Sequence, residues 1–320
     1  MIDLALIPSM QMNKLVYIII LNWNGFKDTI ECVESCLKLV YPSYEIVVVD
    51  NGSDDGSETI IREHFPGLKF IQTGANLGYA GGNNAGIRYA IKEGADYIWL
   101  LNNDTTVDPK ALSELVNIAE MDPVIGITGS KILSYSQPSV LLFAGGLLDL
   151  SLGTANHIGE GRMDIGQFDT SLETGYITGC SLLVKRSVIN DIGLMNENYF
   201  LYYEETEWCI KAKEKAYTLI YVPKSIVLHK ESVSTQKRKG SMTYYLTRNQ
   251  LYFIEHNGIN VQWLKRFKTD LLYLLKLIYR KDLNTAHSIF TAYVHWISGY
   301  MGPLDNPVKI NRHRNYGYKL

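Results

Sequence analysis

The sequence predicts an α/β fold, a largely parallel β-sheet covered by helices, followed by a helical C-terminal region. Two apolar, β-branched runs at 46–49 and 97–101 have the near-continuous hydrophobicity of strands buried on both faces. From Val16 to about Leu133 such strands alternate with helical segments, which favours one continuous sheet. Three further helical segments follow near the end of the chain.

The first half of the chain alternates regularly. Short apolar runs predict strands at 17–21, 46–49, 69–71 and 97–101. The segments between and after them predict helices at 28–39, 58–64, 87–93 and 109–120, with a glycine-rich loop at 76–86. Asp28 is the expected cap of the first helix. Pro109 is the expected first residue of the last one, where its fixed φ is favourable.

The second half has a different pattern. Residues 125–183 alternate between apolar and polar and carry many glycines, which predicts antiparallel strands and hairpins. Glu204–Tyr217 predicts a helix that opens with acids, which are favourable at the positive end of a helix dipole. An apolar strand then ends at His229. The three final helices are predicted at about 241–256, 261–281 and 283–299.

The composition is that of a globular protein, with 320 residues of which 46% are hydrophobic and 20% charged. The four cysteines form no CxxC pair, so we expect no disulfide and a reducing compartment. Residues 1–13 lack the basic start of a signal peptide and predict a flexible lead-in. No window reaches about 18 uninterrupted apolar residues, so no transmembrane helix is expected.

Charge is distributed unevenly along the chain. Residues 261–320 contain ten Lys/Arg and three Asp/Glu, a net charge of +7, whereas the first 260 residues carry −9. An apolar stripe recurs in the basic segment at helical spacing, formed by Leu264, Phe267, Leu271, Leu274, Leu275 and Ile278. No nucleic-acid-binding module is recognised, so an anionic membrane surface is the favoured partner. Packing on the rest of the chain or on a second copy explains the stripe as well.

The segment IVVVDNGSDDGS, residues 46–57, ends a buried strand in an acidic, Gly/Ser-rich turn. Open α/β sheets bind ligands at the carboxyl ends of their strands, which places Asp50 at a candidate site. A phosphate loop would carry Lys and bare glycines, whereas carboxylates suit the donor groups of a base and a ribose. A surface turn without a ligand explains these residues about equally well.

Later motifs favour the ligand-binding interpretation. NLGYAGGNNAG at 76–86 has Asn and Gly at positions of close approach, and YIWLLNNDTTVDP at 97–109 ends a strand in Asn102-Asn103-Asp104. A carboxylate there is placed to ligate a divalent cation on a diphosphate. An aromatic run precedes a cluster of acids within 177–213, and VLHKESVST at 227–235 places His229 at the end of another strand.

From about Val16 to Asn249 these motifs, in this order, resemble the family 2 glycosyltransferases of the GT-A fold, especially the bacterial rhamnosyltransferase-like members. The resemblance implies a Rossmann-like nucleotide-binding sheet merged with an acceptor-side subregion. We expect a lead-in at 1–13, a catalytic domain at 14–240, and a helical region with a basic tail at 241–320. The implied reaction is an inverting, metal-dependent transfer from a dTDP- or UDP-sugar, with dTDP-rhamnose favoured, to a surface-glycan or lipid-linked hydroxyl.

The resemblance also implies a metal site and a catalytic base. Asp104 and His229 are the expected ligands of Mn²⁺ or Mg²⁺, although the family's Asp-x-Asp begins here with the amide Asn102. Glu205 matches the second acid of the family's Glu-Asp-x-Asp and is the expected base. Glu204 and Glu207 are explained without a catalytic role, as acids that are favourable at the start of a helix.

The nucleotide sugar is expected to contact several loops, with Asp50 at the nucleoside and Arg248 over the diphosphate. The predicted set is Asn22, Asn24, Asp50, Asn76, Gly78, Gly82, Asn83, Asn102, Asn103, Asp104 and Arg248, with Asp54 as a weaker member. An exposed helix arginine explains Arg248 equally well. Tyr202 and Tyr203 are interpreted as a sugar-stacking wall or as core. The basic turn 237–239 is expected to act as a lid, with Gly240 aiding its movement.

Two other functions compete with this prediction. A sugar-1-phosphate nucleotidyltransferase would carry a Gly-rich loop with Arg or Lys near the N-terminus, and residues 21–26 contain none. A sugar-nucleotide-binding scaffold without catalysis is compatible with the altered Asn102 and Glu205. The expected location is the cytoplasm, peripheral to the inner face of the cell membrane, with a homodimer as the alternative use of the C-terminal helices.

Overall fold

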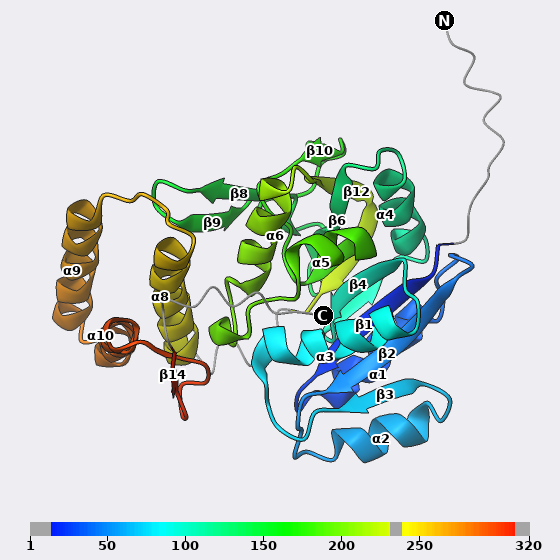
Figure 1. Ribbon diagram of the computed structural model, residues 1–320, viewed down its shortest axis with the longest axis horizontal. Coiled ribbons are helices and arrows are strands. Elements are labelled where there is room, and N and C mark those ends of the chain that lie inside the picture. Colours follow the sequence, from blue (N-terminus) through cyan, green and yellow to red (C-terminus); the bar gives the residue numbers. More distant parts are fainter. Residues whose placement is uncertain (1–13, 231–238, 311–320) are drawn as a thin grey trace, which may run out of the picture.

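The computed structural model describes residues 14–230 and 239–310 (Figure 1). At its centre lies a ten-stranded mixed sheet with the order β10-β12-β6-β11-β4-β1-β2-β3, in which β5 also pairs with β12 and β7 with β6. Four of the strands are parallel neighbours: β1 (Val16–Asn22), β2 (Tyr44–Asp50), β3 (Lys69–Gln72) and β4 (Tyr97–Asn102). The others are β5 (Thr105–Val107), β6 (Ile125–Ser134), β7 (Leu141–Phe143), β10 (Leu172–Glu173), β11 (Ser181–Lys185) and β12 (Thr218–His229).

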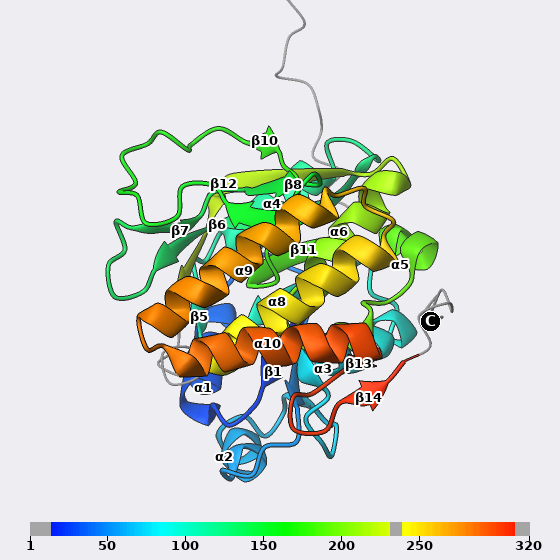
Figure 2. The same cartoon turned by 90° about the vertical axis from the view of Figure 1, so that its left-hand side faces the viewer.

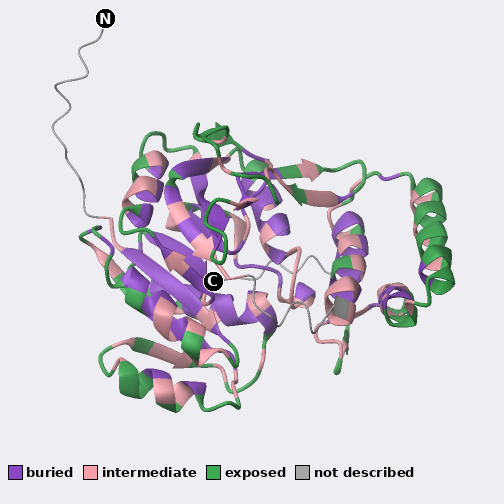
Figure 3. Ribbon diagram, turned by 180° about the vertical axis from the view of Figure 1, so that it is seen from behind, coloured by how far each residue is buried: buried purple, intermediate pink, exposed green. Residues whose placement is uncertain are grey.

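Helices cover both faces of this sheet, so alternate side chains of each strand enter two separate cores. Ile19 packs toward α3 (Gly78–Lys92), α5 (Arg186–Ile192) and α6 (Glu204–Glu214). Ile18 and Ile20 pack toward α1 (Phe26–Cys36), α2 (Ser57–His64) and α4 (Ala111–Ala119). The strands are buried on both sides (Figure 3), which explains their continuous apolar runs.

The second half of the sheet is only partly antiparallel. Strand β6 is antiparallel to β7 and β11, and β8 (Gly146–Asp149) forms a hairpin with β9 (Thr154–His157), as predicted for 125–183. However, β12 runs parallel to β6. Two helices and the 3₁₀ turn η1 (Glu197–Tyr199) lie between β11 and β12, and such a crossover permits a parallel return.

Three predicted helix starts were wrong. Helix α1 begins at Phe26 without a side-chain cap, because the Asp28 carboxylate instead accepts a 2.6 Å hydrogen bond from Lys230 Nζ. Helix α4 begins at Ala111, beyond Pro109, whose carbonyl accepts a hydrogen bond from the Val40 amide. Helix α3 begins at Gly78, so most of the predicted glycine-rich loop is helical.

The C-terminal helices agree with the predicted segments to within two residues: α8 (Lys239–His256), α9 (Trp263–Tyr279) and α10 (Leu283–Ser298). They lie together on one side of the molecule (Figure 2), and the short strands β13 (Tyr300–Met301) and β14 (Val308–Lys309) follow them. Much of α9 is exposed (Figure 3). Among the described residues, none of the helices has the length and apolar character needed to cross a bilayer.

Candidate active site

Polar residues meet where the parallel strands end. Asn22 closes β1 directly opposite Asp50 at the end of β2, and both side chains are fully buried. The Asp50 carboxylate accepts hydrogen bonds from Asn22 Nδ2 (2.6 Å), Gln72 Nε2 (2.8 Å), and the hydroxyl and amide of Ser53 (2.6 and 3.1 Å). Asp50 therefore stabilises the loop that the sequence predicts to bind a nucleoside.

The solvent-facing part of this loop is formed by Asn24 and Asp54. Asn24 Nδ2 donates to Asp54 Oδ1 at 2.8 Å, and the Asp54 amide returns a 2.9 Å bond to Asn24 Oδ1. Asn24 adopts a left-handed φ of 53°, a conformation that Asn tolerates better than most residues. The reciprocal bonds fix the loops after β1 and β2 relative to each other.

The glycines of α3 allow close packing inside the protein, and their predicted contact with the nucleotide stays a prediction. A Cβ at Gly82 would lie 2.4 Å from Leu21 Cδ1, so the helix needs a bare backbone to reach β1. A Cβ at Gly78 would lie 2.2 Å from the carbonyl oxygen of Phe200. These contacts bring the start of α3 against the turn that precedes α6.

Asn76 and Asn83 also have internal partners. Asn76 Oδ1 accepts hydrogen bonds from the Gly78 amide (2.9 Å) and from Asn51 Nδ2 (3.1 Å). Asn83 is buried and donates to the carbonyl of Tyr79 at 3.0 Å, a bond within the helix. The predicted set did not include Asn51, because nothing in its one-dimensional spacing shows that it bridges β2 to α3.

Asp104 and His229, predicted as metal ligands, are in contact. The pairing of β12 with β5 places His229 opposite Thr105, so His229 Nε2 lies 3.0 Å from Asp104 Oδ1. Burial opposes the imidazolium, but Cys180 and the Asp104 carboxylate raise the pKa of His229 well above its usual value.

This pair fits a cation whose remaining ligands come from the donor. Nowhere in 14–230 and 239–310 do three or more His, Cys, Asp or Glu side chains form a ready-made metal site. One carboxylate and one imidazole suit Mn²⁺, and a nucleotide-bound divalent cation commonly has few protein ligands because phosphate oxygens and water complete its shell.

The two amides before Asp104 differ in role. Asn103 Nδ2 donates to Thr29 Oγ1 at 3.0 Å and to the Gly25 carbonyl at 3.4 Å, which ties this turn to the start of α1. Asn102 closes β4 beside Leu21 and is only half-buried, so it lies at the carboxyl edge of the sheet with Asn22 and Asp50.

The acids at the start of α6 lie close together, with Glu204 and Glu207 buried and Glu205 half-buried. Glu207 has nitrogen partners, with Lys211 and His256 each 3.3 Å from its carboxylate. In the described part of the chain, Glu204 and Glu205 have no ion-pair partner, and all three acids have one buried carboxylate oxygen without a hydrogen bond. Burial raises the pKa of Glu205 to about 7. Burial and the adjacent Glu205 charge raise the pKa of Glu204 well above its usual value.

Arg248 is not an exposed helix arginine. Its side chain is fully buried on α8, and its guanidinium donates to the carbonyls of Gly302 (2.7 Å) and Tyr199 (3.0 Å). The exposed alternative was therefore wrong, because burial inside the C-terminal region cannot be read from the local sequence, and the contact with the diphosphate stays a prediction.

The predicted sugar-stacking tyrosines pack inside the protein. The Tyr203 ring contacts Phe253 with centroids 5.2 Å apart, and its hydroxyl donates to the Gly153 carbonyl at 3.2 Å. Tyr202 packs against a cluster around Tyr244. The predicted basic lid falls largely within 231–238, outside the described residues, whereas Gly240 lies in the first turn of α8.

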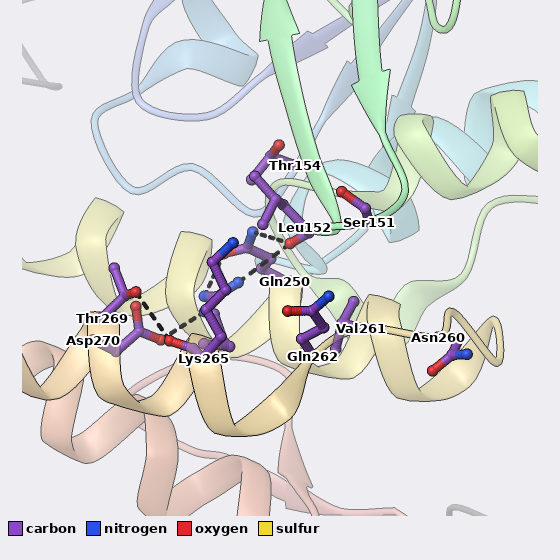
Figure 4. Close-up of a pocket in the computed structure, with 11 residues that line it drawn as sticks. Ser151, Leu152, Thr154, Gln250, Asn260, Val261, Gln262, Lys265, Thr269 and Asp270 are labelled. Atoms are coloured by element: carbon purple, nitrogen blue, oxygen red, sulfur yellow. Dashed lines mark hydrogen bonds and ion pairs between the residues drawn. The ribbon is translucent and has the colours of Figure 1, made fainter.

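A cavity of about 410 Å³ lies between the β8–β9 turn and helices α8 and α9 (Figure 4). Its wall is a hydrogen-bonded network in which Arg266 donates to Gln250 and Asp270, both at 2.7 Å. Gln250 in turn donates to the Gly153 carbonyl at 3.1 Å, the same oxygen that accepts from Tyr203. The cavity was not predicted, because its residues come from three distant segments. Tyr203, which shares the Gly153 carbonyl with Gln250, directly precedes Glu204 in the chain.

Comparisons with known proteins agree on one family. Residues 17–193 match the model of glycosyl transferase family 2. Low-salt glycan biosynthesis hexosyltransferase Agl10 of Haloferax volcanii is 26% identical over 303 residues, covering 89% of this chain and 92% of that protein. An N-acetylglucosaminyl-diphospho-decaprenol L-rhamnosyltransferase of Mycobacterium tuberculosis is 25% identical over 214 residues, covering 61% and 69%. The mannosyltransferase PcManGT of Pyrobaculum calidifontis, solved with GDP-Man and Mn²⁺, has the same fold, with a TM-score of 0.56, 14% identity, and coverage of 88% and 86%.

Proposed function

Because this chain belongs to glycosyl transferase family 2, we propose that it is an inverting, metal-dependent hexosyltransferase. It has the GT-A fold that the sequence predicted, and its relatives include a hexosyltransferase and a rhamnosyltransferase that act in glycan assembly or on a lipid-linked sugar. The donor is a nucleotide-diphosphate sugar, with dTDP-rhamnose favoured over UDP-hexoses.

The observation that carries the proposal is the carboxyl pair Glu204–Glu205 at the start of α6, in which Glu204 is buried and Glu205 is half-buried with one carboxylate oxygen shielded from solvent. A carboxyl group with no ion-pair partner among the described residues and a pKa near 7 is suited to accept a proton at neutral pH. In the proposed reaction the acceptor hydroxyl attacks the anomeric carbon, the bond from that carbon to the diphosphate breaks, and Glu205 takes the hydroxyl proton. Attack opposite the leaving group inverts the anomeric configuration.

The other predicted residues supply binding. Asp104 and His229 would hold a divalent cation, which when bound neutralises charge on the leaving diphosphate. The loops of Asn24 and Asp50 would take the nucleoside, with the buried bonds of Asp50 keeping them in place before the donor arrives. Asn102, at the same edge, is placed near the ribose or a cation-bound water.

The proposed acceptor is a lipid-linked or surface glycan. The relative from Mycobacterium tuberculosis is named for a diphospho-decaprenol acceptor, and helix α9 exposes an apolar face beside basic residues. Such a face is suited to the surface of an anionic membrane, which would place the enzyme at the inner face of the cell membrane. A second copy of the chain is the competing occupant of this face.

The experiment that tests the proposal is a screen of nucleotide sugars for thermal stabilisation with and without Mn²⁺, followed by measurement of nucleoside diphosphate release. We expect one donor to raise the melting temperature in a Mn²⁺-dependent way and to be hydrolysed slowly without an acceptor. Stabilisation without any release would favour the non-catalytic scaffold, which the amide at Asn102 keeps as the second candidate. Pyrophosphate release from a sugar-1-phosphate and a nucleoside triphosphate would instead identify a nucleotidyltransferase.

A further inference from the structure

The turn immediately before the proposed base has an unusual backbone. Phe200, Tyr202 and Tyr203 have φ values of 68°, 69° and 79°, in the left-handed region that non-glycine residues rarely occupy. Such conformations persist only where the surroundings enforce them, and they concentrate at functional sites. Glu204 and Glu205 follow directly, so their position depends on this turn.

One side chain of α8 supplies much of that enforcement. Asn249 is fully buried, and its Nδ2 donates to three carbonyls of the turn: Tyr199 at 2.9 Å, Leu201 at 2.7 Å and Tyr202 at 2.9 Å. Because one amide group binds all three carbonyls, it fixes the direction in which each of them points. Asn249 thus acts as a clip across the turn.

Arg248 orients that clip. Its Nε donates to Asn249 Oδ1 at 3.0 Å, which leaves the Nδ2 side of the amide facing the turn. Its Nη2 reaches the Tyr199 carbonyl at 3.0 Å, and its Nη1 reaches the Gly302 carbonyl at 2.7 Å. The guanidinium therefore connects the turn to the segment that follows α10.

The turn is also fixed from its opposite side. The Phe200 carbonyl accepts a 2.6 Å hydrogen bond from the Tyr79 amide in the first turn of α3, and the Tyr203 carbonyl accepts one from the Glu207 amide at 2.9 Å. The turn therefore lies between α3, α6 and α8, so a shift in α8 contacts would be transmitted to the acids.

From these contacts we propose that Arg248 and Asn249 are positioning residues for the transfer reaction: they hold the left-handed turn 200–203 and thereby set the place of the Glu205 carboxylate. Their polar side-chain atoms bond to the protein itself. This inference rests on the proposed function only where it names Glu205 as the base. The C-terminal helices are accordingly part of the catalytic unit, although they lie outside the nucleotide-binding sheet.

The test is Asn249→Asp, which keeps the shape of the side chain but replaces the donor amide with an acceptor facing three carbonyl oxygens. Asn257→Asp is the matched control, because it makes the same change directly after the end of α8, at an amide whose Nδ2 donates to the Phe253 carbonyl at 2.9 Å. Asn249→Ala, which removes the donor without adding a charge, is the second variant if the aspartate variant does not fold.

Four measurements are made on the full chain. Hydrogen exchange should be about tenfold or more faster for amides of 199–207 in Asn249→Asp, and unchanged in the strands at 16–22 and 44–50. Affinity for dTDP or UDP with Mn²⁺ should be unchanged. Turnover of the donor found in the screen should fall by about 10²-fold at constant KM, because misplacing a catalytic group by about 1 Å has that scale of effect. The acid limb of the pH profile should also move to lower pH as water reaches Glu205.

The outcomes separate the two ideas. Unchanged exchange across 199–207 in both Asn249 variants would overturn the clip. Exchange could instead become faster while turnover and pH profile stay equal to those of Asn257→Asp. Asn249 would then hold the turn without setting the position of Glu205, and this result would also overturn the proposal. Normal turnover in Glu205→Gln would refute the assigned base while leaving the exchange result to stand on its own.

Discussion

Glu205 is half-buried and, like Glu204, has no ion-pair partner among the described residues, which sets both apart from Glu207. Glu207, only two residues away, is paired with Lys211 and His256 and is therefore better explained as a structural acid. We predict that Glu205→Gln lowers turnover by about 10²-fold or more while donor affinity stays nearly constant, because the amide keeps the shape but accepts no proton. Glu214→Gln, at the exposed end of α6, is the control for a lost charge.

The pH dependence follows from the same residue. Since a base must be ionised, turnover should rise as the pH passes about 7, and the limb should vanish in Glu205→Gln. The groups that face this carboxyl are Glu204 and Cys209 on α6, Tyr79 on α3, Tyr176, Tyr202 and Tyr203. A raised carboxyl pKa stabilises the protonated folded state, so this contribution to stability is lost as the pH rises through about 7. Near-normal turnover of the Gln variant would transfer the role to Glu204 or Glu207.

The metal site can be tested by moving charge between two neighbouring positions. Asp104→Asn should weaken Mn²⁺ binding in the presence of nucleotide by at least about tenfold, since it removes the single carboxylate at the site. Asn102→Asp should strengthen it, because it restores the leading acid of the family's motif at the same edge of the sheet. Calorimetric titration with Mn²⁺ and dTDP measures both changes. Equal affinity in all three proteins would contradict the assignment.

At the scale of elements, α3 depends on how closely it approaches β1. We predict that Gly82→Ala destabilises the fold by about 1–3 kcal/mol, because the new methyl would overlap Leu21 Cδ1 at 2.4 Å in a packed interior. Gly67→Ala is the control, since a Cβ there meets nothing within 4 Å. Urea denaturation of the two variants measures the difference, and similar midpoints would show that α3 can shift away from the sheet at little cost.

Helix α9 is the element with the largest unpartnered apolar face. Leu264, Leu271, Leu275 and Ile278 are all more than half exposed, whereas Leu277 is buried against α10. Trp263 and Trp296 stack on each other with centroids 5.7 Å apart, so they join α9 to α10. Most of the apolar stripe predicted from the spacing is exposed.

The membrane prediction is tested on that stripe. Leu271→Glu combined with Leu275→Glu should abolish co-sedimentation with anionic vesicles at low salt, while Leu37→Glu, a similarly exposed leucine after α1, should leave it intact. The charged pair would repel the lipid surface and leave the inner face of α9 unchanged. If wild type and variant pellet equally, and sedimentation velocity shows a dimer only in the wild type, a second copy covers this face.

Across the whole molecule, local patterns predicted the strands, the C-terminal helices and the convergence of Asn22, Asp50 and Asn102, because the ends of parallel strands must share an edge. The contact of Asp104 with His229 depended on a β5–β12 pairing between residues 125 positions apart in the chain. Spacing alone could not supply that pairing, and the family resemblance did. The buried environment of Arg248 carried no such signal, so its burial and its bonds to the turn before α6 could not be predicted.

The bonds from α8 to the 199–203 turn also mean that the parts of the proposed site are synthesised in a fixed order. The loops proposed for the nucleoside are complete by Asp54, and the first proposed metal ligand is Asp104. Asn249 emerges 50 residues after Tyr199, the first carbonyl that it holds. A chain that ended before α8 would carry the loops proposed for the nucleoside and Glu205 without the side chain that holds the turn before that acid, so truncation there is expected to impair transfer more than nucleotide binding.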